Sequence, residues 1–249
     1  MTAGVFGRDD GDYFEAGGAA LTWTPPSAHR ARYRVRVFAE RQEPVASATD
    51  VSLFHWWGWD DGLRAATLAA RADQAGLEAM ISPWWGGDPT RPAGGFELAL
   101  HGERGDFDFA RVRVGLRAVV PLPASARLDL SAGAGRTDGA APPQRRWILG
   151  GPTSLRGFAP GIAVGPTFLS GRAELTRPLR ELPWVRAVDL TLFADGSWAG
   201  ETGRVRWTDA IASAEVGLSI LDGVLRLDAA WGWKGPAGRR LDLYFGGPR

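Results

Sequence analysis

The chain of 249 residues carries 29 basic and 28 acidic residues, and the resulting net charge of +1 gives no electrostatic case for binding nucleic acid. It contains no cysteine, which excludes disulfides, thiolate nucleophiles and cysteine-based metal sites and is compatible with the cell envelope. No run of about 18 apolar residues occurs, so a transmembrane helix is excluded. The first residues lack the basic and apolar regions of a secretion signal, so for an exported protein we expect the chain to be a mature portion or a fragment.

The dominant periodicity from the N-terminus onward is two. In ARYRVRVFAE, Arg32, Arg34 and Arg36 fall on one face of an extended chain, with tyrosine and valine between them. Such alternation predicts a strand that lies between two different environments. ARVRVGLRAVVPL (110–122) and ARLDLSAGAG (126–135) repeat the pattern. Weaker candidates lie at 13–24, 63–73, 77–85 and 95–104, but TLAARAD and RADQAGLEA also fit a helix, and residues 50–75 also fit a loop.

The second half of the chain continues the alternation. Charged side chains recur on one face of the expected strands, and leucine, valine, alanine and aromatic residues occupy the other. The sequence predicts about twelve strands of about 9–11 residues, a length that crosses a bilayer when the strand is tilted. Short turns rich in Gly, Pro and Asp indicate an up-and-down meander, and without a linker residues 1–249 are expected to form a single β-barrel domain. The charged positions are Arg172, Glu174, Asp189, Asp195, Glu215, Arg226, Asp228 and Asp242.

Two architectures produce this alternation. In a soluble barrel or sandwich the apolar face points inward, whereas in an outer-membrane barrel it meets lipid and the polar face lines a wet lumen. The number and length of the strands favour the second, as does a plain apolar face of Ala, Val and Leu that would fill a soluble core poorly. Tryptophans near strand ends are typical of interfacial girdles. These are Trp23, Trp56, Trp57, Trp84, Trp85, Trp184, Trp198, Trp207, Trp231 and Trp233. We therefore expect an all-β, antiparallel, up-and-down transmembrane β-barrel.

One connection, at about 136–161, is much longer than a hairpin loop. It contains RRWILGGPTSLRGFAP, whose apolar residues argue against disorder. If this loop folds into the lumen, Arg156 enters a confined space where an unpaired guanidinium is costly and a carboxylate partner is required. Glu174 and Asp195 on the next two strands are the expected partners. A bidentate contact with them would latch the loop inside the barrel.

LGGPTSLRGF, GRAELTRPL and LFADGSW, in this order and spacing, resemble the C-terminal barrel of the bacterial surface antigen family. This family comprises outer-membrane assembly and translocation proteins of the BamA, TamA and two-partner-secretion type. The resemblance implies an inward loop whose tip arginine meets acidic residues on neighbouring strands. The residues that it assigns to this latch are Leu155, Arg156, Gly157 and Phe158 at the tip, Glu174 on the following strand, and Phe193 with Asp195 on the strand after it.

The sequence departs from the family pattern at three points. Gly196 follows Asp195 directly, whereas the family places glycine one residue further on. The last strand continues past Tyr244 and Phe245 instead of ending on an aromatic residue. The sequence predicts about twelve strands, whereas the barrel of the family has sixteen, so the strands form either part of such a barrel or a smaller one. No periplasmic repeats precede the barrel, so we expect such modules upstream in a longer gene product or a reduced barrel without them.

The resemblance implies a barrel of the bacterial outer membrane that inserts or exports polypeptides. Its partners would be the lipid bilayer and unfolded polypeptide clients, and it would have no enzymatic activity, cofactor or metal. Weakly paired first and last strands would leave backbone donors and acceptors that template an incoming strand. The alternatives are a passive pore or structural barrel without assembly activity, and a soluble β-barrel that binds an apolar ligand.

The remaining motifs give weak signals of chemistry. His29, His55 and His101 are scattered, and no HExxH, G-x-S-x-G or P-loop spacing occurs. A hydrolase built on Ser52 and His55 is therefore disfavoured, and no set of metal ligands has a sensible spacing.

The tryptophan pairs and the arginine stripes can each be interpreted either as a binding site or as a structural feature of the barrel. The tryptophan pairs 56–57 and 84–85 fit a sugar platform, but interfacial anchoring is the commoner use of such pairs. The arginine stripes at 32, 34, 36 and at 111, 113, 117 fit an anionic-ligand site, but carboxylates balance them, which favours a solvated lumen face.

Overall fold

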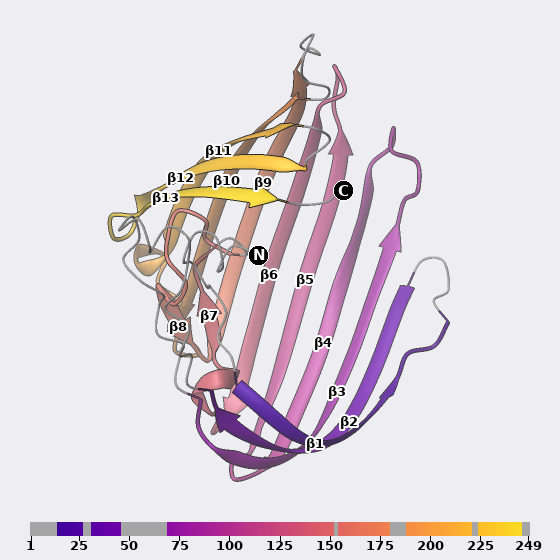
Figure 1. Cartoon of the computed structure of the whole chain (residues 1–249), viewed down its shortest axis with the longest axis vertical. Coiled ribbons are helices and arrows are strands. Elements are labelled where there is room, and N and C mark those ends of the chain that lie inside the picture. Colours follow the sequence, from indigo (N-terminus) through magenta and orange to yellow (C-terminus); the bar gives the residue numbers. More distant parts are fainter. Residues whose placement is uncertain are drawn as a thin grey trace.

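The computed structural model of the chain describes residues 14–26, 31–45, 69–151, 154–179, 188–220 and 224–245. Within them, eleven strands form one antiparallel sheet, and the short strands β7 and β8 form a separate hairpin (Figure 1). The sheet contains β1 (Phe14–Trp23), β2 (Ala31–Pro44), β3 (Ala72–Trp85), β4 (Ala93–Gly105), β5 (Phe109–Pro121), β6 (Arg127–Gly139), β9 (Thr167–Leu179), β10 (Val188–Gly200), β11 (Ile211–Ile220), β12 (Leu225–Lys234) and β13 (Arg239–Phe245). The described residues include no helix long and apolar enough to cross a membrane.

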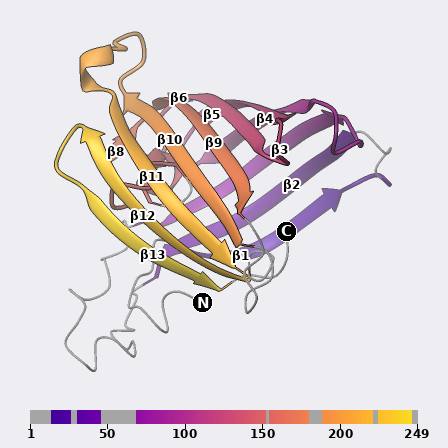
Figure 2. The ribbon, with the colours of Figure 1, turned by 90° about the horizontal axis from the view of Figure 1, so that it is seen from above.

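The sheet is a meander in which each strand pairs with the next, apart from the step from β6 to β9 around the β7–β8 hairpin. It curves into a trough (Figure 2). Strands β1 and β13 are its two edges and are not paired with each other in the described part of the chain, so the sheet is open. The expected all-β antiparallel architecture is confirmed, with eleven sheet strands in place of about twelve.

The start of β3 corrects the weaker predictions in this region. The helical interpretation of residues 71–79 is wrong, because β3 begins at Ala72 and pairs with β2 on one side and β4 on the other. The alternation continues through this strand, since Ala72 and Gln74 are buried while Asp73 is exposed. Of the strand expected at 63–73, residues 69–71 precede β3 and 63–68 lie outside the described residues.

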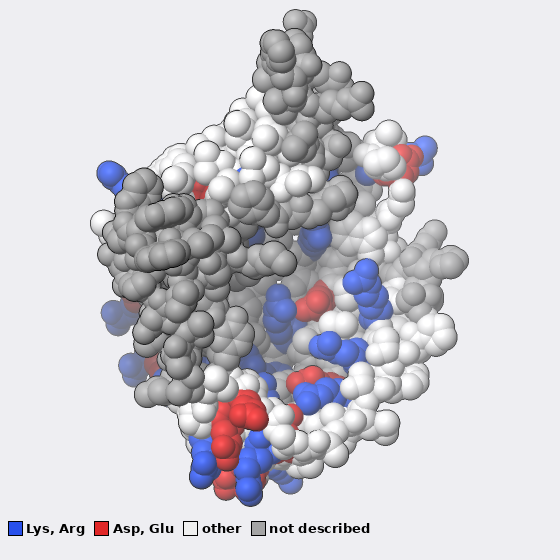
Figure 3. All heavy atoms as spheres, viewed as in Figure 1, with Lys and Arg blue, Asp and Glu red and all other residues white. Residues whose placement is uncertain are grey.

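The two faces of the sheet differ as a barrel wall requires. The convex face is apolar and exposed, and the concave face carries the charged and polar side chains. Buried polar residues on the concave face include Gln42, Glu103, Glu174, Asp195, Glu215 and Asp228. Figure 3 shows basic and acidic side chains gathered in the hollow of the trough. Exposed apolar residues of the convex face include Leu21, Leu77, Leu116, Leu192, Leu218 and Leu241.

The two ends of the trough differ in their connections. At one end, named here the long-loop end, lie the connections 45–71, 106–108, 140–166, 201–210 and 235–238. At the opposite end, named here the short-loop end, lie the connections 24–30, 86–92, 122–126, 180–187 and 221–224. Bacterial outer-membrane barrels have short periplasmic turns and longer extracellular loops, which makes the long-loop end the extracellular one in such a barrel.

Candidate functional site

The connection between β6 and β9, residues 140–166, folds back onto the concave face of the sheet (Figure 1). This inward segment contains a 3-10 turn (Pro143–Arg145) and the hairpin of β7 (Trp147–Leu149) with β8 (Ala163–Gly165). The connection begins and ends later in the chain than the predicted range of about 136–161, because β6 continues to Gly139 and the main sheet resumes only at Thr167. Arg136 pairs with Thr167, so these residues extend the sheet itself.

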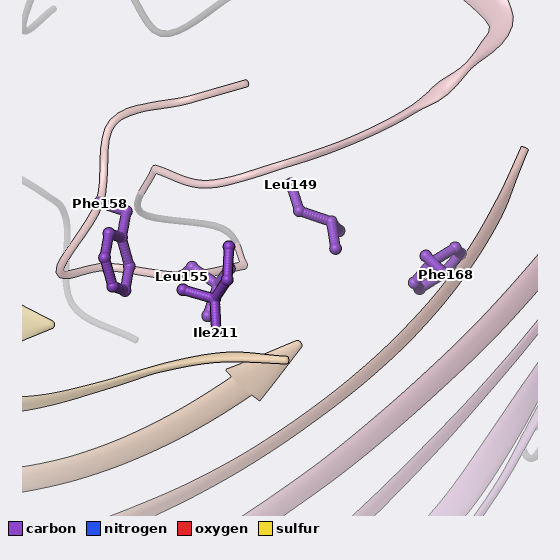
Figure 4. Close-up of a cluster of buried hydrophobic side chains, with 5 residues drawn as sticks. All are labelled: Leu149, Leu155, Phe158, Phe168 and Ile211. Carbon is purple, nitrogen blue, oxygen red and sulfur yellow. The ribbon is translucent and has the colours of Figure 1, made fainter. Parts of the chain in front are cut away.

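The apolar residues of the inward segment pack against the barrel wall. Leu149, Leu155 and Phe158 form a buried cluster with Phe168 of β9 and Ile211 of β11 (Figure 4). Leu155 is completely inaccessible to solvent, and Phe158 is 2% exposed. Burial of each such side chain stabilises the packed segment by about 1.5–3 kcal/mol. The segment is therefore held by a small core of its own inside the polar trough.

Two glycines set the turn that brings the tip of the segment to the wall. Gly150 and Gly151 have φ of +116° and +74°, values that side chains disfavour. The Ser154 hydroxyl accepts a hydrogen bond from the Gly150 N–H at 2.7 Å. The Gly151 N–H donates to the Phe158 carbonyl at 2.9 Å, which closes the tip into a compact turn.

Gly157 and Phe158 fit into the surface of β11 and β12. The Gly157 N–H donates to the Ser213 hydroxyl at 3.1 Å. A Cβ at position 157 would lie 2.7 Å from the Ser213 Cβ and 2.7 Å from the Trp231 carbonyl carbon, so any other residue would displace a strand. The Phe158 ring occupies the space beside Gly232, where a side chain is absent.

Arg156 is surrounded by acidic residues of β10, β11 and β12. Its Nη1 lies 2.9 Å from Glu215 Oε1 and 3.6 Å from Asp228 Oδ2. Its backbone N–H donates to Asp195 Oδ2 at 3.2 Å, and its guanidinium carbon lies 3.9 Å from the Phe193 ring centroid. The side chain is only 12% exposed, which strengthens these charge-assisted contacts relative to contacts in water.

Two further arginines complete this tip cluster. The Arg226 Nε donates to Asp228 Oδ1 and Oδ2 at 2.7 and 2.8 Å, and its other guanidinium nitrogens lie 3.5 Å from Glu215 and 3.9 Å from Glu174. Arg172 lies 3.8 Å from Asp195, whose other oxygen accepts a hydrogen bond from the Ser213 hydroxyl. The tip cluster is defined as Arg156, Arg172, Glu174, Asp195, Glu215, Arg226 and Asp228.

The structure brings the residues of the predicted latch together in the tip cluster. Leu155, Gly157 and Phe158 seat the tip, and Phe193 and Asp195 contact Arg156 directly. Glu174 lies on the same face of β9, opposite Phe193 in the register. Glu215 and Asp228 were not predicted as partners of the guanidinium, although both belong to the charged face that the alternation identified.

A second anchor, which sequence reasoning missed, holds the start of the inward segment. Arg145 Nη2 lies 2.6 Å from Glu103 Oε1 on β4 and 3.5 Å from Glu40 Oε1 on β2. The Glu103 side chain is fully buried, and His101 Nε2 also contacts its Oε1 at 2.7 Å. Gln144 Nε2 donates to Gln42 Oε1 at 2.9 Å.

This base cluster is defined as Arg36, Glu40, Gln42, Glu78, His101, Glu103, Arg111, Gln144 and Arg145. Gln144 is also bonded in both directions to the backbone of Ala70, at 3.0 Å each way. The Arg111 guanidinium lies 3.9 Å above the Trp147 ring. The sequence signals for the cluster are the Arg145–Arg146 pair at the start of the motif and the arginine stripes that contain Arg36 and Arg111. The carboxylates of Glu78 and Glu103 lie on strands whose patterns were weak.

The residues considered for a hydrolase pair and for a sugar platform lie apart from both clusters or outside the described residues. Ser52, His55, Trp56 and Trp57 belong to the part that the structure does not describe. Trp85 is 51% exposed beside Phe96, with ring centroids 5.9 Å apart, at the short-loop end. Among the described residues, no group of three or more His, Asp or Glu side chains is arranged to hold a metal ion.

Comparisons with known proteins identify the family. The family model of the Omp85 superfamily domain matches residues 91–246. The structure resembles BamA from Haemophilus ducreyi lacking POTRA domains 1–3, with a TM-score of 0.67 and 15% identity over 92% of this chain and 53% of that one. It also resembles CdiB from Acinetobacter baumannii, with a TM-score of 0.63 and 13% identity over 92% of this chain and 40% of that one.

The chain thus spans about half the length of these solved proteins. No curated protein sequence matches it significantly. The family match covers more than half of the chain, includes the inward segment and agrees with the resemblance carried by its motifs. The chain therefore belongs to the Omp85 superfamily, and its open, curved sheet is the wall of a transmembrane β-barrel.

Proposed function

We propose that the chain is the barrel of a bacterial outer-membrane protein that inserts or exports polypeptides, in which the tip cluster latches the inward segment to the wall. The contact between Arg156 and Glu215 carries the proposal, because it fixes a loop inside the trough at the strands nearest the C-terminal edge. The apolar convex face supports the bilayer location, and membership of the superfamily supports the handling of polypeptides.

The physical mechanism uses the open edges. Strands β1 and β13 present backbone N–H and C=O groups along edges that are not paired with each other in the described part of the chain. Such edges can template an incoming strand by main-chain hydrogen bonding. The latch at β10–β12 would hold the wall beside the β13 edge in place while that edge exchanges partners.

Reconstitution of the full-length gene product tests this proposal. Insertion or export of an unfolded outer-membrane client is measured in proteoliposomes with the wild type, Arg156→Ala and Arg91→Ala. The last variant removes an arginine from the exposed 86–92 turn and serves as the control. We expect the wild type and the control to act on the client and Arg156→Ala to lose most of that activity. A wild type without client activity would contradict the proposal.

Conductance across planar bilayers separates this function from that of a passive pore. For an insertion or export barrel with a latched segment, we expect small basal conductance that fluctuates more in Arg156→Ala, because the released segment moves in the lumen. A large steady conductance in the wild type, unchanged in Arg156→Ala and accompanied by no client activity, would favour the passive pore. Unchanged conductance together with unchanged heat stability would contradict the latch.

A further inference from the structure

An apolar groove of about 700 Å³ lies on the convex face near the long-loop end, over β5 to β12. Its floor is a row of paired residues that runs across the sheet. Leu116 pairs with Ala132, Ala132 with Gly171, Gly171 with Gly196, Gly196 with Ala212, and Ala212 with Lys234. At about 4.8 Å between strands, the four small residues in this row span about 14 Å.

The groove exists because side chains are missing from the middle of the row. A Cβ at Gly171 would meet nothing within 4 Å, and one at Gly196 would make only ordinary contacts at 3.8 Å or more. Both glycines therefore leave room on the outside of the wall, and neither is required there by close backbone packing. On the remainder of the convex face, many outward positions carry leucine or valine side chains that project from the wall.

The end of the groove nearest the loops combines tryptophan with a single cation. Trp207 and Trp233 line it and are 70% and 67% exposed, as expected for side chains at a membrane interface. Lys234, the only lysine of the chain, lines the same end, and its ammonium group donates to the Trp207 carbonyl. Among the described residues, no carboxylate forms an ion pair with Lys234.

We infer that this groove binds one acyl chain of an anionic membrane lipid, whose phosphate group contacts Lys234. The inference rests on the bilayer location of the convex face in the proposed function. An apolar channel within a lipid-facing surface is filled by hydrocarbon, and the row leads from Leu116 to the ammonium of Lys234. An ammonium with three donors, only one of which contacts Trp207, has the charge and free hydrogen-bonding capacity that a phosphate requires.

Lipid binding by the purified full-length gene product tests the inference. After delipidation in a neutral detergent, native mass spectrometry measures the retention of dioleoyl phosphatidylglycerol and dioleoyl phosphatidylcholine. We expect the anionic lipid to bind about fivefold more tightly, the effect of one cation near a headgroup of net negative charge, because the choline cation of phosphatidylcholine offsets its phosphate. Lys234→Gln is expected to remove this preference while phosphatidylcholine binding stays unchanged.

Variants that fill the groove with side chains provide a second test of lipid binding. In Gly171→Leu combined with Gly196→Leu, new side chains occupy the floor, and we expect retention of both lipids to fall. Gly17→Leu is the matched control, because Gly17 pairs with Arg41 on the same convex face, outside the groove, and a Cβ there meets nothing within 4 Å. Equal retention by the filled variant and the control would overturn the groove as the binding site.

Chemical labelling of the wild type avoids dependence on folded variants. Lys234 is the only side-chain amine of these 249 residues, so its acetylation is read from a single peptide by mass spectrometry, with the N-terminal amine as the internal reference. We expect vesicles of phosphatidylglycerol to slow acetylation of Lys234 relative to vesicles of phosphatidylcholine. Equal rates in the two lipids would overturn the headgroup contact.

Flotation with liposomes distinguishes failure of this inference from failure of the proposed function. If the protein does not float with vesicles, the bilayer location itself is wrong. If it floats and acts on a polypeptide client but retains both lipids equally, only the lipid site is wrong.

Discussion

The base and the tip of the inward segment each contact the sheet through an arginine, Arg145 and Arg156. The two arginines reach opposite parts of the sheet and differ in the charged and polar side chains around them. The tip reaches β10, β11 and β12 through Arg156, where the tip cluster sets three arginines against four carboxylates. The base reaches β2 and β4 through Arg145, where three arginines meet three glutamates with a histidine and two glutamines among them. Because the carboxylates outnumber the arginines only in the tip cluster, we expect the tip to depend on its cations more strongly than the base does.

The two anchors connect parts of the sheet that do not pair with each other in the described part of the chain. Strands β2–β4 and β10–β12 lie near the two edges of the sheet, and the described edges are not paired with each other. The inward segment leaves the middle of the sheet at β6, contacts both halves and returns at β9. We propose that it acts as a strut across the trough, with a tightly fitted tip and a base that has alternative hydrogen-bond partners.

Removal of the tip cation is expected to give the largest effect on stability. Arg156→Ala leaves Glu215 and Asp228, each with a side chain that is 2% exposed, without their nearest shared cation. Loss of one partner from a buried ion pair costs about 3–5 kcal/mol, and we expect about 3 kcal/mol here because Arg226 remains. Urea unfolding in detergent, followed by tryptophan fluorescence, measures the change.

Arg91→Ala is the matched control for this experiment. Arg91 is 82% exposed at the short-loop end and pairs only with Asp88 in the described contacts, so we expect no measurable change in the free energy of unfolding. If Arg156→Ala were as stable as this control, the tip would be held by its apolar contacts alone and the asymmetry of the two anchors would be lost.

A change in the packing of the tip is expected to give the second-largest loss of stability. In Gly157→Ala, the new Cβ lies 2.7 Å from backbone or Cβ atoms of two neighbouring strands, so β11 and β12 or the tip must move. Overpacking of this kind costs about 1–3 kcal/mol. The temperature at which the folded band converts on semi-native gels reports the change. Gly17→Ala, where the space is open, should leave that temperature unchanged.

The period-two pattern predicted most of the fold because each strand keeps one wet and one apolar face. The pattern failed where composition favours another structure. In RADQAGLEA, alanine, leucine and glutamate favour a helix, but pairing of β3 with both β2 and β4 overrides this weak propensity. Residues 63–68 stay outside the described part of the chain, so the strand expected there remains a prediction.

The residues at the tip of the inward segment could be predicted from the sequence more fully than the carboxylates that contact Arg156. The sequence placed Glu215 and Asp228 on the charged face, but their distance from Arg156 depends on the strand register. Phe193 pairs with Glu174 on one side and Glu215 on the other, which brings Glu215 under the tip. The base cluster was not foreseen, because Glu40 and Glu103 approach Arg145 only through the pairing of β2 with β3 and of β3 with β4, which brings together residues that are far apart in the sequence.

Removal of the base cation is expected to cost less than removal of the tip cation. Arg145→Ala removes the guanidinium that lies 2.6 Å from the fully buried carboxylate of Glu103. His101 remains 2.7 Å from the same carboxylate oxygen. We expect about 2 kcal/mol of destabilisation, at the lower end of the cost of an unsatisfied charged group. Urea unfolding under the conditions used for Arg156→Ala gives the comparison. A larger loss for Arg145→Ala would reverse the proposed order of the two anchors.

Gln144 gives the smallest and most local test of the base. Its amide joins the inward segment to Gln42 on β2 and to both backbone groups of Ala70, so Gln144→Ala removes three hydrogen bonds in one substitution. Each neutral hydrogen bond contributes about 1 kcal/mol net, and water can replace part of the loss at the part-buried amide, so we expect about 1 kcal/mol in total. Hydrogen exchange measured by mass spectrometry should show faster exchange in β2 and around Ala70, while β11 and β12 keep wild-type rates. Faster exchange in β11 and β12 as well would mean that the two anchors are coupled through the inward segment, and the strut would then respond as one unit.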